Sequence, residues 1–379
     1  MHLARLRLQG FRNLADVRLE LPPEGIALVG PNAQGKTNLL EALHYLELFR
    51  SFRGVRDAEL VRFGEAFFRV EGVVRGATGG GEERTLAAAW QREGARKRVT
   101  LDGVEPERLA DAVGHLGAVL FTPADLALVN DGPHERRRFL DIVLSLNEPG
   151  YLGALQRYRR VLGQRNAALR EGGAAAIAAW DEPLVREGAR VFASRRAWIA
   201  GVGEAFASLH AEISGGEPAE LVYLPALPTD ARPDDAETFD ESLRSALRSS
   251  VDQERRMQTT VVGPHRDEFR MRVPNGGRLR DVRSYGSGGQ RRSVALALRL
   301  LEARTLEEQR GRAPILLMDD VFAELDEARS ERVLELLERT AVGQVILTAP
   351  RASDIRLRGD RLPRWSIRDG VIQMGEWGP

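Results

Sequence analysis

The chain of 379 residues contains no cysteine, which excludes disulfide bonds, thiolate catalysis and zinc–thiolate sites. It has no run of about 18 apolar residues that could span a membrane. Residues 1–5 lead straight into a strand-like alternation, without the apolar segment of a signal peptide. Sustained heptads and internal repeats are also missing, which argues against a long coiled coil. These absences favour a cytoplasmic globular protein.

An excess of charge is missing too, because 55 basic residues balance 55 acidic residues. A nucleic-acid-binding protein of this composition needs a local basic patch. Among the basic residues only Lys36 and Lys97 are lysines. A bias toward arginine codons explains the arginine excess, but it makes a retained lysine informative, since Lys36 stands where a compact ammonium is needed.

The N-terminal part has the apolar pattern of strands followed by one helix. We expect strands at residues 3–8, 17–21 and 26–29, a glycine-bearing loop at 30–37, a helix at 39–49 and further strands within 66–104. The run Gly79-Gly80-Gly81 is typical of a hairpin tip.

The middle of the chain has helical spacing of apolar residues from about Asp125 to Ser214. We expect Pro183 to interrupt this pattern and Asp181 to cap a new helix. Residues 215–237 predict a loop. The rest of the chain predicts helices at 237–258, 287–308 and 326–339, strands at 315–318 and 345–347, and a hairpin over 365–372 with a tight turn at Asp369-Gly370.

The first motif is a complete GxxxxGK[ST] phosphate-binding loop between a predicted strand and a predicted helix, formed by Gly30, Pro31, Asn32, Ala33, Gln34, Gly35, Lys36 and Thr37, with Asn38 following. Its backbone N–H groups are expected to cradle phosphate oxygens, with Lys36 reaching the β- and γ-phosphates. A chance match is expected in about one chain in several hundred. The motif therefore predicts ATP and Mg²⁺ as cofactors.

The second motif is the apolar strand at 315–318 followed by Asp319 and Asp320, as in a Walker B strand. We expect Thr37 and Asp319 to hold Mg²⁺. We expect Asp320 to polarise the attacking water, so that Asp320 and Lys36 are the catalytic residues. Many ordinary strands also end in an aspartate, and only the phosphate-binding loop makes this pattern specific.

The third motif, Ser287-Gly288-Gly289-Gln290, begins a predicted helix and looks like an ABC signature. An N-capped helix is the alternative interpretation, since serine is a favoured cap. Two glycines, however, are poor for helix stability and suit close backbone approach to an anion. In proteins with this motif the helix closes on ATP held by a second subunit. Asp326, in Glu324-Leu325-Asp326, resembles a D-loop residue.

The 37–287 interval and several local sequences resemble the RecF family of ABC/SMC-type ATPases over essentially the whole chain. The matching segments are 10–13, 30–38, 121–126, 136–141, 263–267 and 319–326. The resemblance implies a weak ATPase that forms an ATP-dependent homodimer, with Arg12 in the nucleotide-binding set. It also implies binding to DNA at single-strand/double-strand junctions, and partnership with RecR and indirectly with RecO and RecA.

The predicted fold is an ABC-type α/β lobe with antiparallel β additions and a mostly helical second lobe. We expect residues 1–121 and 305–379 to form the ATPase lobe and residues 122–304 to form the helical lobe, ending in the signature helix. A transport-type ABC subunit is one alternative, but no Q-loop glutamine lies near Phe121 and Thr348-Ala349-Pro350 lacks a switch histidine. Another SMC-like ATPase is the second alternative. The short Asp320 side chain predicts slow hydrolysis.

Sequence evidence for a DNA-binding surface is weak. The arginines that cluster are Arg136, Arg137 and Arg138, then Arg157, Arg159, Arg160 and Arg165, then Arg291 and Arg292. Arginine suits phosphate contacts, yet in so arginine-rich a chain most such clusters are solvated helix faces. His265, between Pro264 and Arg266, favours a structural turn or an interlobe contact over catalysis.

Overall fold

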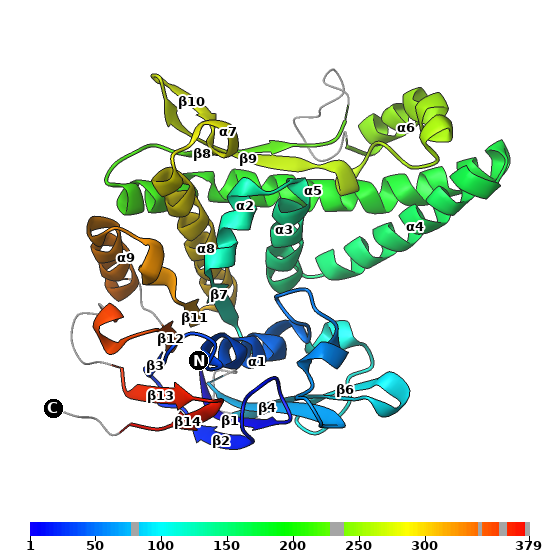
Figure 1. Ribbon diagram of the computed structural model, residues 1–379. Helices are drawn as coiled ribbons and strands as arrows, with labels where there is room; N and C mark the ends of the chain where they lie inside the picture. Colours follow the sequence, from blue (N-terminus) through cyan, green and yellow to red (C-terminus); the bar gives the residue numbers. More distant parts are fainter. Residues whose placement is uncertain (77–82, 228–238, 340–342, 356–361, 376–379) are drawn as a thin grey trace. The chain divides into compact units, whose positions relative to one another are not determined.

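The computed structural model describes residues 1–76, 83–227, 239–339, 343–355 and 362–375, so the expected glycine hairpin tip at 79–81 lies outside the described residues (Figure 1). The chain forms two compact units, one of residues 1–125 and 302–379 and one of residues 126–301. Each unit has a buried apolar core of its own.

The first unit contains a six-stranded sheet in the order β14-β13-β3-β12-β11-β7. All neighbouring strands run parallel except the terminal hairpin β13–β14. The central strands are apolar except near their carboxyl ends, where Asp319 and Thr348 stand, as expected of parallel strands covered on both faces. The strands are β3 (Gly25–Val29), β7 (Ala118–Phe121), β11 (Ile315–Asp319), β12 (Val345–Ala349), β13 (Arg364–Arg368) and β14 (Val371–Gln373).

The same unit contains a five-stranded antiparallel sheet in the order β2-β1-β4-β5-β6. Its strands are β1 (His2–Gln9), β2 (Val17–Glu20), β4 (Phe67–Arg75), β5 (Glu83–Gln91) and β6 (Arg96–Leu101). Helix α1 (Lys36–Leu48) contacts strands of both sheets and lies between them (Figure 1). Apolar residues from α1 and both sheets therefore form one core. Helix α9 (Glu327–Arg339) follows β11.

The second unit is mostly helical and also carries a three-stranded antiparallel sheet in the order β10-β9-β8. Its helices are α2 (Ala127–Asn130), α3 (Pro133–Asn147), α4 (Tyr151–Glu171), α5 (Ala174–Ser214), α6 (Phe239–Met257) and α7 (Val282–Tyr285). Its strands are β8 (Glu220–Leu224), β9 (Glu268–Asn275) and β10 (Arg278–Asp281). Helix α8 (Gly288–Arg310) begins among the residues of this unit. The prediction of one loop over 215–237 was wrong at 220–224, where β8 forms. This strand pairs with β9 and buries Leu221 opposite Met271.

Short 3-10 helices connect these elements. They are η1 (Asp57–Leu60), η2 (Glu93–Ala95), η3 (Leu109–Ala112), η4 (Pro123–Leu126), η6 (Pro264–Arg266), η7 (Val321–Glu324) and η8 (Ala352–Asp354).

The expected interruption at Pro183 was also wrong, because α5 continues through it as one helix of 41 residues. Asp181 caps nothing; its carboxylate accepts a 2.8 Å hydrogen bond from Arg165 on α4. The guanidinium of Arg165 is fully buried and also donates to Glu254 at 2.7 Å and to Thr260 at 2.8 Å. These contacts and the buried Leu184 hold α5 against its neighbours, which offsets the one backbone hydrogen bond that proline removes.

We predict that Arg165→Met lowers the free energy of unfolding by about 3 kcal/mol, because it leaves the Glu254 carboxylate buried without its cation. Arg160→Met is the matched control: Arg160 is exposed on the same helix, and its loss should change stability by less than about 0.5 kcal/mol. Urea unfolding followed by far-UV circular dichroism measures both. Equal effects of the two variants would show that the Arg165 cluster is not stabilising.

Candidate nucleotide-binding site

The loop after β3 contains left-handed backbone at Ala33 and Gly35, and it depends on glycine at Gly30 and Gly35. Gly35 has φ of 114°, and Ala33 has φ of 65°. A Cβ atom at Gly30 would lie 2.5 Å from the backbone oxygen of Ile367. Helix α1 begins at Lys36 with no side-chain cap and no acidic residue in its first turn. Its first N–H groups are therefore available to an anion in this loop.

The ammonium of Lys36 is held inside the loop. Its side chain is buried, and Nζ donates to the backbone oxygens of Gly30 at 2.8 Å and Pro31 at 3.2 Å, with Asn32 Oδ1 at 3.4 Å. A compact ammonium fits this ring of oxygens, as expected from its retention in a lysine-poor chain. The other lysine, Lys97, contacts Asp57 at 3.0 Å and serves the fold.

Residues far apart in the sequence meet at the ends of the parallel strands. Thr37 Oγ1 donates to Asp319 Oδ1 at 3.0 Å, and Thr348 Oγ1 donates to the same oxygen at 2.8 Å. Asp319 and Thr348 are directly paired where β11 and β12 end. Hydroxyl and carboxylate oxygens are the ligands that Mg²⁺ prefers, so Thr37 and Asp319 fit this cation.

Asp320 adopts a left-handed backbone conformation, with φ of 46°, which aspartate tolerates better than most residues. Its N–H donates to Thr348 Oγ1 at 3.2 Å, so one hydroxyl positions both aspartates. Burial raises the pKa of the Asp320 carboxyl, as does the charge of Asp319, whereas the charge of Lys36 opposes this rise. In the sequence Thr348 is only part of a segment that lacks a histidine. The strand register that places Thr348 directly opposite Asp319 reveals its role.

Two turns brace the outside of the loop. Asn13 Nδ2 donates to the backbone oxygen of Gln34 at 3.3 Å, and Asn38 Nδ2 donates to Asn13 Oδ1 at 2.8 Å. On the other side, the N–H of Asp369 donates to Gln34 Oε1 at 2.6 Å and the N–H of Gly370 donates to the Gln34 oxygen at 3.1 Å. The predicted Asp369-Gly370 turn is therefore a support of the phosphate-binding loop.

Arg12 lies in the first of these turns, but its guanidinium is engaged within the chain. It forms two hydrogen bonds to the buried Glu41 carboxylate, at 2.9 and 3.0 Å, and one to the backbone oxygen of Glu59 at 3.1 Å. The Arg12–Glu41 pair fastens the turn to α1. A direct contact of Arg12 with nucleotide stays a prediction.

Known proteins that are similar to this chain agree with the ABC/SMC-like order of its motifs. A family model described as the RecF/RecN/SMC N terminal domain matches residues 2–370. A protein of Anaeromyxobacter dehalogenans strain 2CP-C, named DNA replication and repair protein RecF, is 38% identical over 98% of this chain and 99% of its own length. The chain belongs to the RecF family.

Solved structures agree with this family. A structure described as the recombination mediator protein RecF-ATP in the RecFOR pathway is similar with a TM-score of 0.88 and 32% identity, over 99% of this chain and 98% of that one. A Smc head domain of Pyrococcus furiosus shares the fold alone, with a TM-score of 0.58 and 18% identity over 98% and 95%. The predicted ABC/SMC-type α/β fold is confirmed, and a transport-type subunit is not favoured. No helix in the described residues has the length and apolar character that a membrane span requires.

The signature segment of this RecF-family chain lies in the second unit. Ser287 Oγ accepts from the N–H of Gln290 at 3.2 Å, while Gln290 Oε1 accepts from the N–H of Ser287 at 2.9 Å. This is the reciprocal capping box of an N-capped helix. Yet Gly288 has no heavy atom within 4 Å of where a Cβ would lie, so packing within the chain does not require its glycine. Ser287 and Gly288 are both exposed.

Asp326 lies in the first unit at the start of α9. Its Oδ1 accepts from the N–H of Arg329 at 2.9 Å, and this hydrogen bond lowers the pKa of the Asp326 carboxyl. The side chain is exposed and can also meet a group outside the chain.

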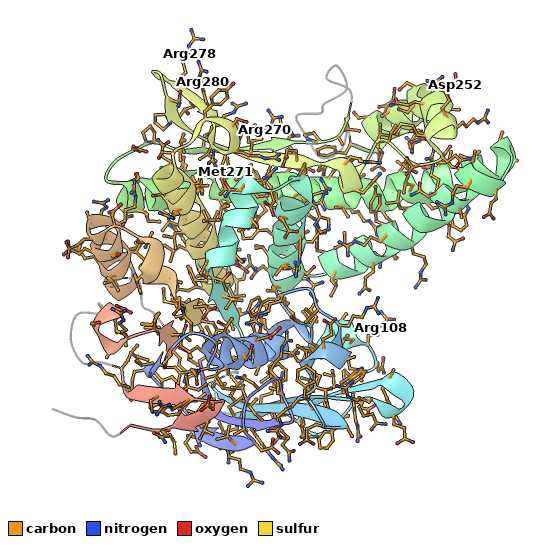
Figure 2. The ribbon with its side chains drawn as sticks, viewed as in Figure 1. Arg108, Asp252, Arg270, Met271, Arg278 and Arg280 are labelled. Atoms are coloured by element: carbon orange, nitrogen blue, oxygen red, sulfur yellow. The ribbon has the colours of Figure 1, made fainter. Side chains whose placement is uncertain are left out.

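Most arginines that cluster in the sequence are engaged in the fold. Arg136 is buried and forms a bidentate ion pair with Glu268 at 2.7 Å, and Arg137 donates to the backbone oxygen of Asp267 at 2.7 Å. Arg165 is fully buried. Figure 2 instead shows Arg278 and Arg280 pointing outward at the β9–β10 hairpin.

His265 has the structural role that its flanking residues favoured. Its Nε2–H donates to the backbone oxygen of Thr260 at 3.0 Å, and Nδ1 accepts from the Tyr158 hydroxyl at 2.7 Å. Burial lowers the pKa of His265 to about 4, so the ring is neutral at pH 7. These contacts make His265 a fixed part of the second unit.

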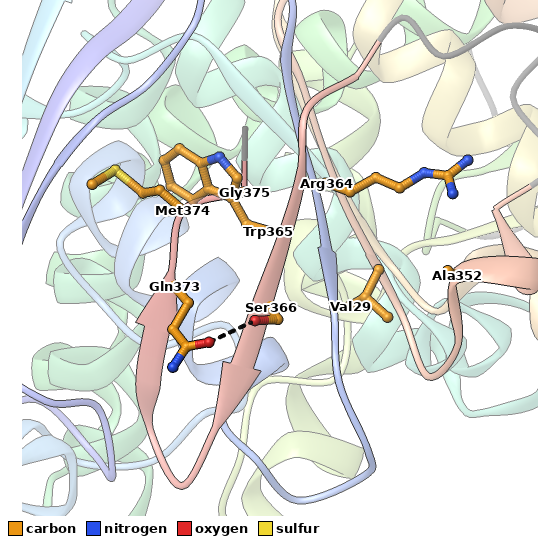
Figure 3. Close-up of a pocket in the computed structure, with 8 residues that line it drawn as sticks. All are labelled: Val29, Ala352, Arg364, Trp365, Ser366, Gln373, Met374 and Gly375. Carbon is orange, nitrogen blue, oxygen red and sulfur yellow. Dashed lines mark hydrogen bonds between the residues drawn. The ribbon is translucent and has the colours of Figure 1, made fainter. Parts of the chain in front are cut away.

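A shallow cavity of about 270 Å³ lies beside β13 and contains no residue of the predicted site. One hydrogen bond, from Ser366 Oγ to Gln373 Oε1 at 3.4 Å, crosses the strands that line it (Figure 3). Its lining is Val29, Ala352, Arg364, Trp365, Ser366, Gln373, Met374 and Gly375. No group of three or more metal-ligating His, Cys, Asp or Glu side chains occurs in the described ranges, and the Thr37–Asp319 pair remains the best cation site.

We predict that Gly370→Ala is more destabilising than Gly103→Ala. Both glycines have positive φ, 77° and 83°, so both substitutions cost about 1 kcal/mol of backbone strain. Only at Gly370 would the new Cβ meet backbone, 1.9 Å from the Asn13 oxygen, which should cost about 2 kcal/mol more. Thermal unfolding of the two variants measures the difference. Equal melting temperatures would show that Gly370 is not packed closely against the Asn13 backbone.

Proposed function

We propose that this chain is an ATP-dependent DNA-binding protein of recombinational repair. The observation that carries the proposal is the convergence of the buried Lys36 ammonium with the Thr37 hydroxyl and the Asp319 carboxylate at one sheet edge. Relatives named DNA replication and repair protein RecF, and a RecF structure described with ATP, support the same conclusion. We place the activity in the cytoplasm, at the nucleoid.

In this proposal the phosphate-binding loop, residues 30–38, binds the phosphates of ATP through its N–H groups and Lys36. Thr37 and Asp319 would hold Mg²⁺, which when bound neutralises charge on the phosphate oxygens. Asp320 accepts hydrogen bonds from the attacking water, and Thr348 holds Asp319 and Asp320 in their orientation. Asp320 is short, and its left-handed backbone is tied to Thr348. These constraints support a weak, slow ATPase.

The signature segment, Ser287 to Gln290, and Asp326 are proposed to meet the nucleotide of a second subunit. The open space around Gly288 and the exposure of Ser287 support this role, since the chain alone does not explain why glycine stands there. ATP would then join two copies of the chain in a homodimer, and slow hydrolysis would release it. Each dimer would then contain two nucleotide sites, each made of one phosphate-binding loop and the signature segment of the other copy.

The DNA substrate is proposed to be a single-strand/double-strand junction, bound without base preference. RecR and RecO are the proposed partners, because a RecF relative is described within the RecFOR pathway. Through them the chain would help to load RecA at gaps. Family membership is the support for these partners.

We predict that Lys36→Arg lowers affinity for ATP by about 100-fold or more, because a guanidinium cannot fit where Gly30 and Pro31 oxygens surround Nζ. Lys97→Arg is the matched control: Arg can still pair with Asp57 and cover the Tyr45 ring, so ATP binding should be unchanged. Isothermal titration calorimetry with ATP reads both. Normal ATP binding by Lys36→Arg would refute the assignment of residues 30–38 as the phosphate-binding loop.

A second pair of variants separates hydrolysis from dimerisation. Asp320→Asn keeps the shape but removes the proton acceptor, so ATP should bind, hydrolysis should fall by about 100-fold or more, and an ATP-bound dimer should accumulate. Ser287→Arg places a bulky cation at the helix start, so ATP should bind but no dimer should form. Size-exclusion chromatography with ATP and a direct ATP-binding assay measure both.

Ser284→Arg, at an exposed position three residues earlier, controls for the added charge and should dimerise normally. If Ser287→Arg dimerises as the wild-type chain does, the signature assignment is wrong.

A further inference from the structure

The outer face of the five-stranded sheet, turned away from α1, carries an unexplained pair of arginines. Strand alternation buries Leu6 and Leu8 on the α1 side and places Arg5 and Arg7 on the outer side. The registers of β1 and β2 pair Arg7 directly with Arg18. Like charges directly opposite each other across two strands are destabilising. On its other side Arg7 lies directly opposite Glu71 of β4, which offsets part of the charge of Arg7. Arg18 stands on the edge strand β2, so Arg7 is the residue directly opposite it.

Neighbouring arginines on the same face do have acidic partners. Arg5 pairs with Glu83 at 2.9 Å, Arg75 pairs with Glu83 at 2.7 Å, and Arg69 pairs with Glu71. Within the described residues, neither Arg7 nor Arg18 forms an ion pair or a side-chain hydrogen bond. Two guanidinium groups thus keep their donors available at one point of the sheet.

These arginines line a groove of about 410 Å³. Val73 and Thr85, which are opposite each other on β4 and β5, also line it. Glu20 and Glu71 also line the groove, so the lining is not uniformly basic. The two arginines therefore border a volume that a group the size of a phosphate can enter.

We propose that this groove binds phosphodiester groups of the DNA backbone, with Arg7 and Arg18 as the contacting residues. The planar fork of a guanidinium matches two phosphate oxygens, and an anion between the two arginines would relieve their repulsion. A protein partner fits less well, because protein interfaces are centred on apolar or aromatic anchors, and the groove lining has no exposed large apolar side chain. Contacts of this kind do not depend on base sequence.

The proposal rests on the proposed function and deepens it by assigning the DNA-contacting face. The groove lies on the opposite side of the five-stranded sheet from α1, the helix that begins at the phosphate-binding loop. Neither arginine belongs to the nucleotide site. ATP binding and DNA binding can therefore be tested independently.

The test is the double variant Arg7→Gln with Arg18→Gln, measured by fluorescence anisotropy with a labelled junction DNA and ATP at several salt concentrations. The DNA dissociation constant should rise by about tenfold or more, and the slope of log affinity against log salt should fall by about 2, because two phosphate contacts are lost. ATP affinity should not change. The melting temperature should stay close to that of the wild type, since the variant removes both the like-charge pair and the opposite-charge neighbours Arg7 and Glu71.

The matched control is Arg244→Gln with Arg255→Gln, which removes the same charge from the second unit. It should leave DNA affinity within about twofold of the wild type. Arg7→Lys with Arg18→Lys keeps the charge and should retain more than half of the salt slope that the Gln variant loses.

Unchanged DNA affinity and salt slope in the Gln variant overturn the groove, while binding by the wild type upholds the proposed function. Equal losses in the Gln variant and the control variant also overturn it, since they would report net charge alone. Absence of DNA binding by the wild-type chain with ATP overturns both proposals. A lowered melting temperature of the Gln variant, with affinity recovered at low temperature, would show a structural role and likewise reject the groove.

Discussion

One carboxylate organises the nucleotide site. Asp319 accepts hydrogen bonds from the hydroxyls of Thr37 and Thr348 on the same oxygen. This is possible because β3, β12 and β11 are parallel neighbours whose ends coincide. Since Asp319 and Thr348 are both buried, losing either hydrogen bond would cost about 1–3 kcal/mol and misplace the others. The phosphate-binding loop and the Asp320 backbone are arranged around this carboxylate.

The second unit depends on a different kind of contact, the buried arginine. Arg195 is almost fully buried and donates to Asp141 at 2.7 Å, to Asp267 at 2.9 Å and to the backbone oxygen of Pro264 at 2.7 Å. Burial raises the pKa of Asp267 to about 6, although Arg195 favours its charged form. Such networks are stable only when every member is satisfied. Arginine abundance in this chain is therefore largely structural and says little about DNA.

This distinction decides which arginines are informative for function. Arg136 and Arg165 have the acidic partners that a buried guanidinium requires. Arg7 and Arg18 instead lie opposite each other on β1 and β2, and within the described residues neither forms an ion pair, although Glu71 of β4 lies opposite Arg7. These two neighbouring guanidinium groups, whose donors are not used by ion pairs in the described residues, are the basis of the proposed phosphate contact.

The sequence by itself determined the local chemistry: the glycine-bearing loop, Lys36, the aspartates after an apolar strand, the capped signature helix and the family. These follow from spacing and turn chemistry, which act over a few residues. It could not determine which distant residues meet. The pairing of Thr348 with Asp319, the bracing of Gln34 by Asp369-Gly370, the passage of α5 through Pro183 and the strand β8 all depend on neighbours far along the chain. Only the tertiary structure decided them, because hydrogen bonds and burial between distant segments outweigh the local preferences that a sequence displays.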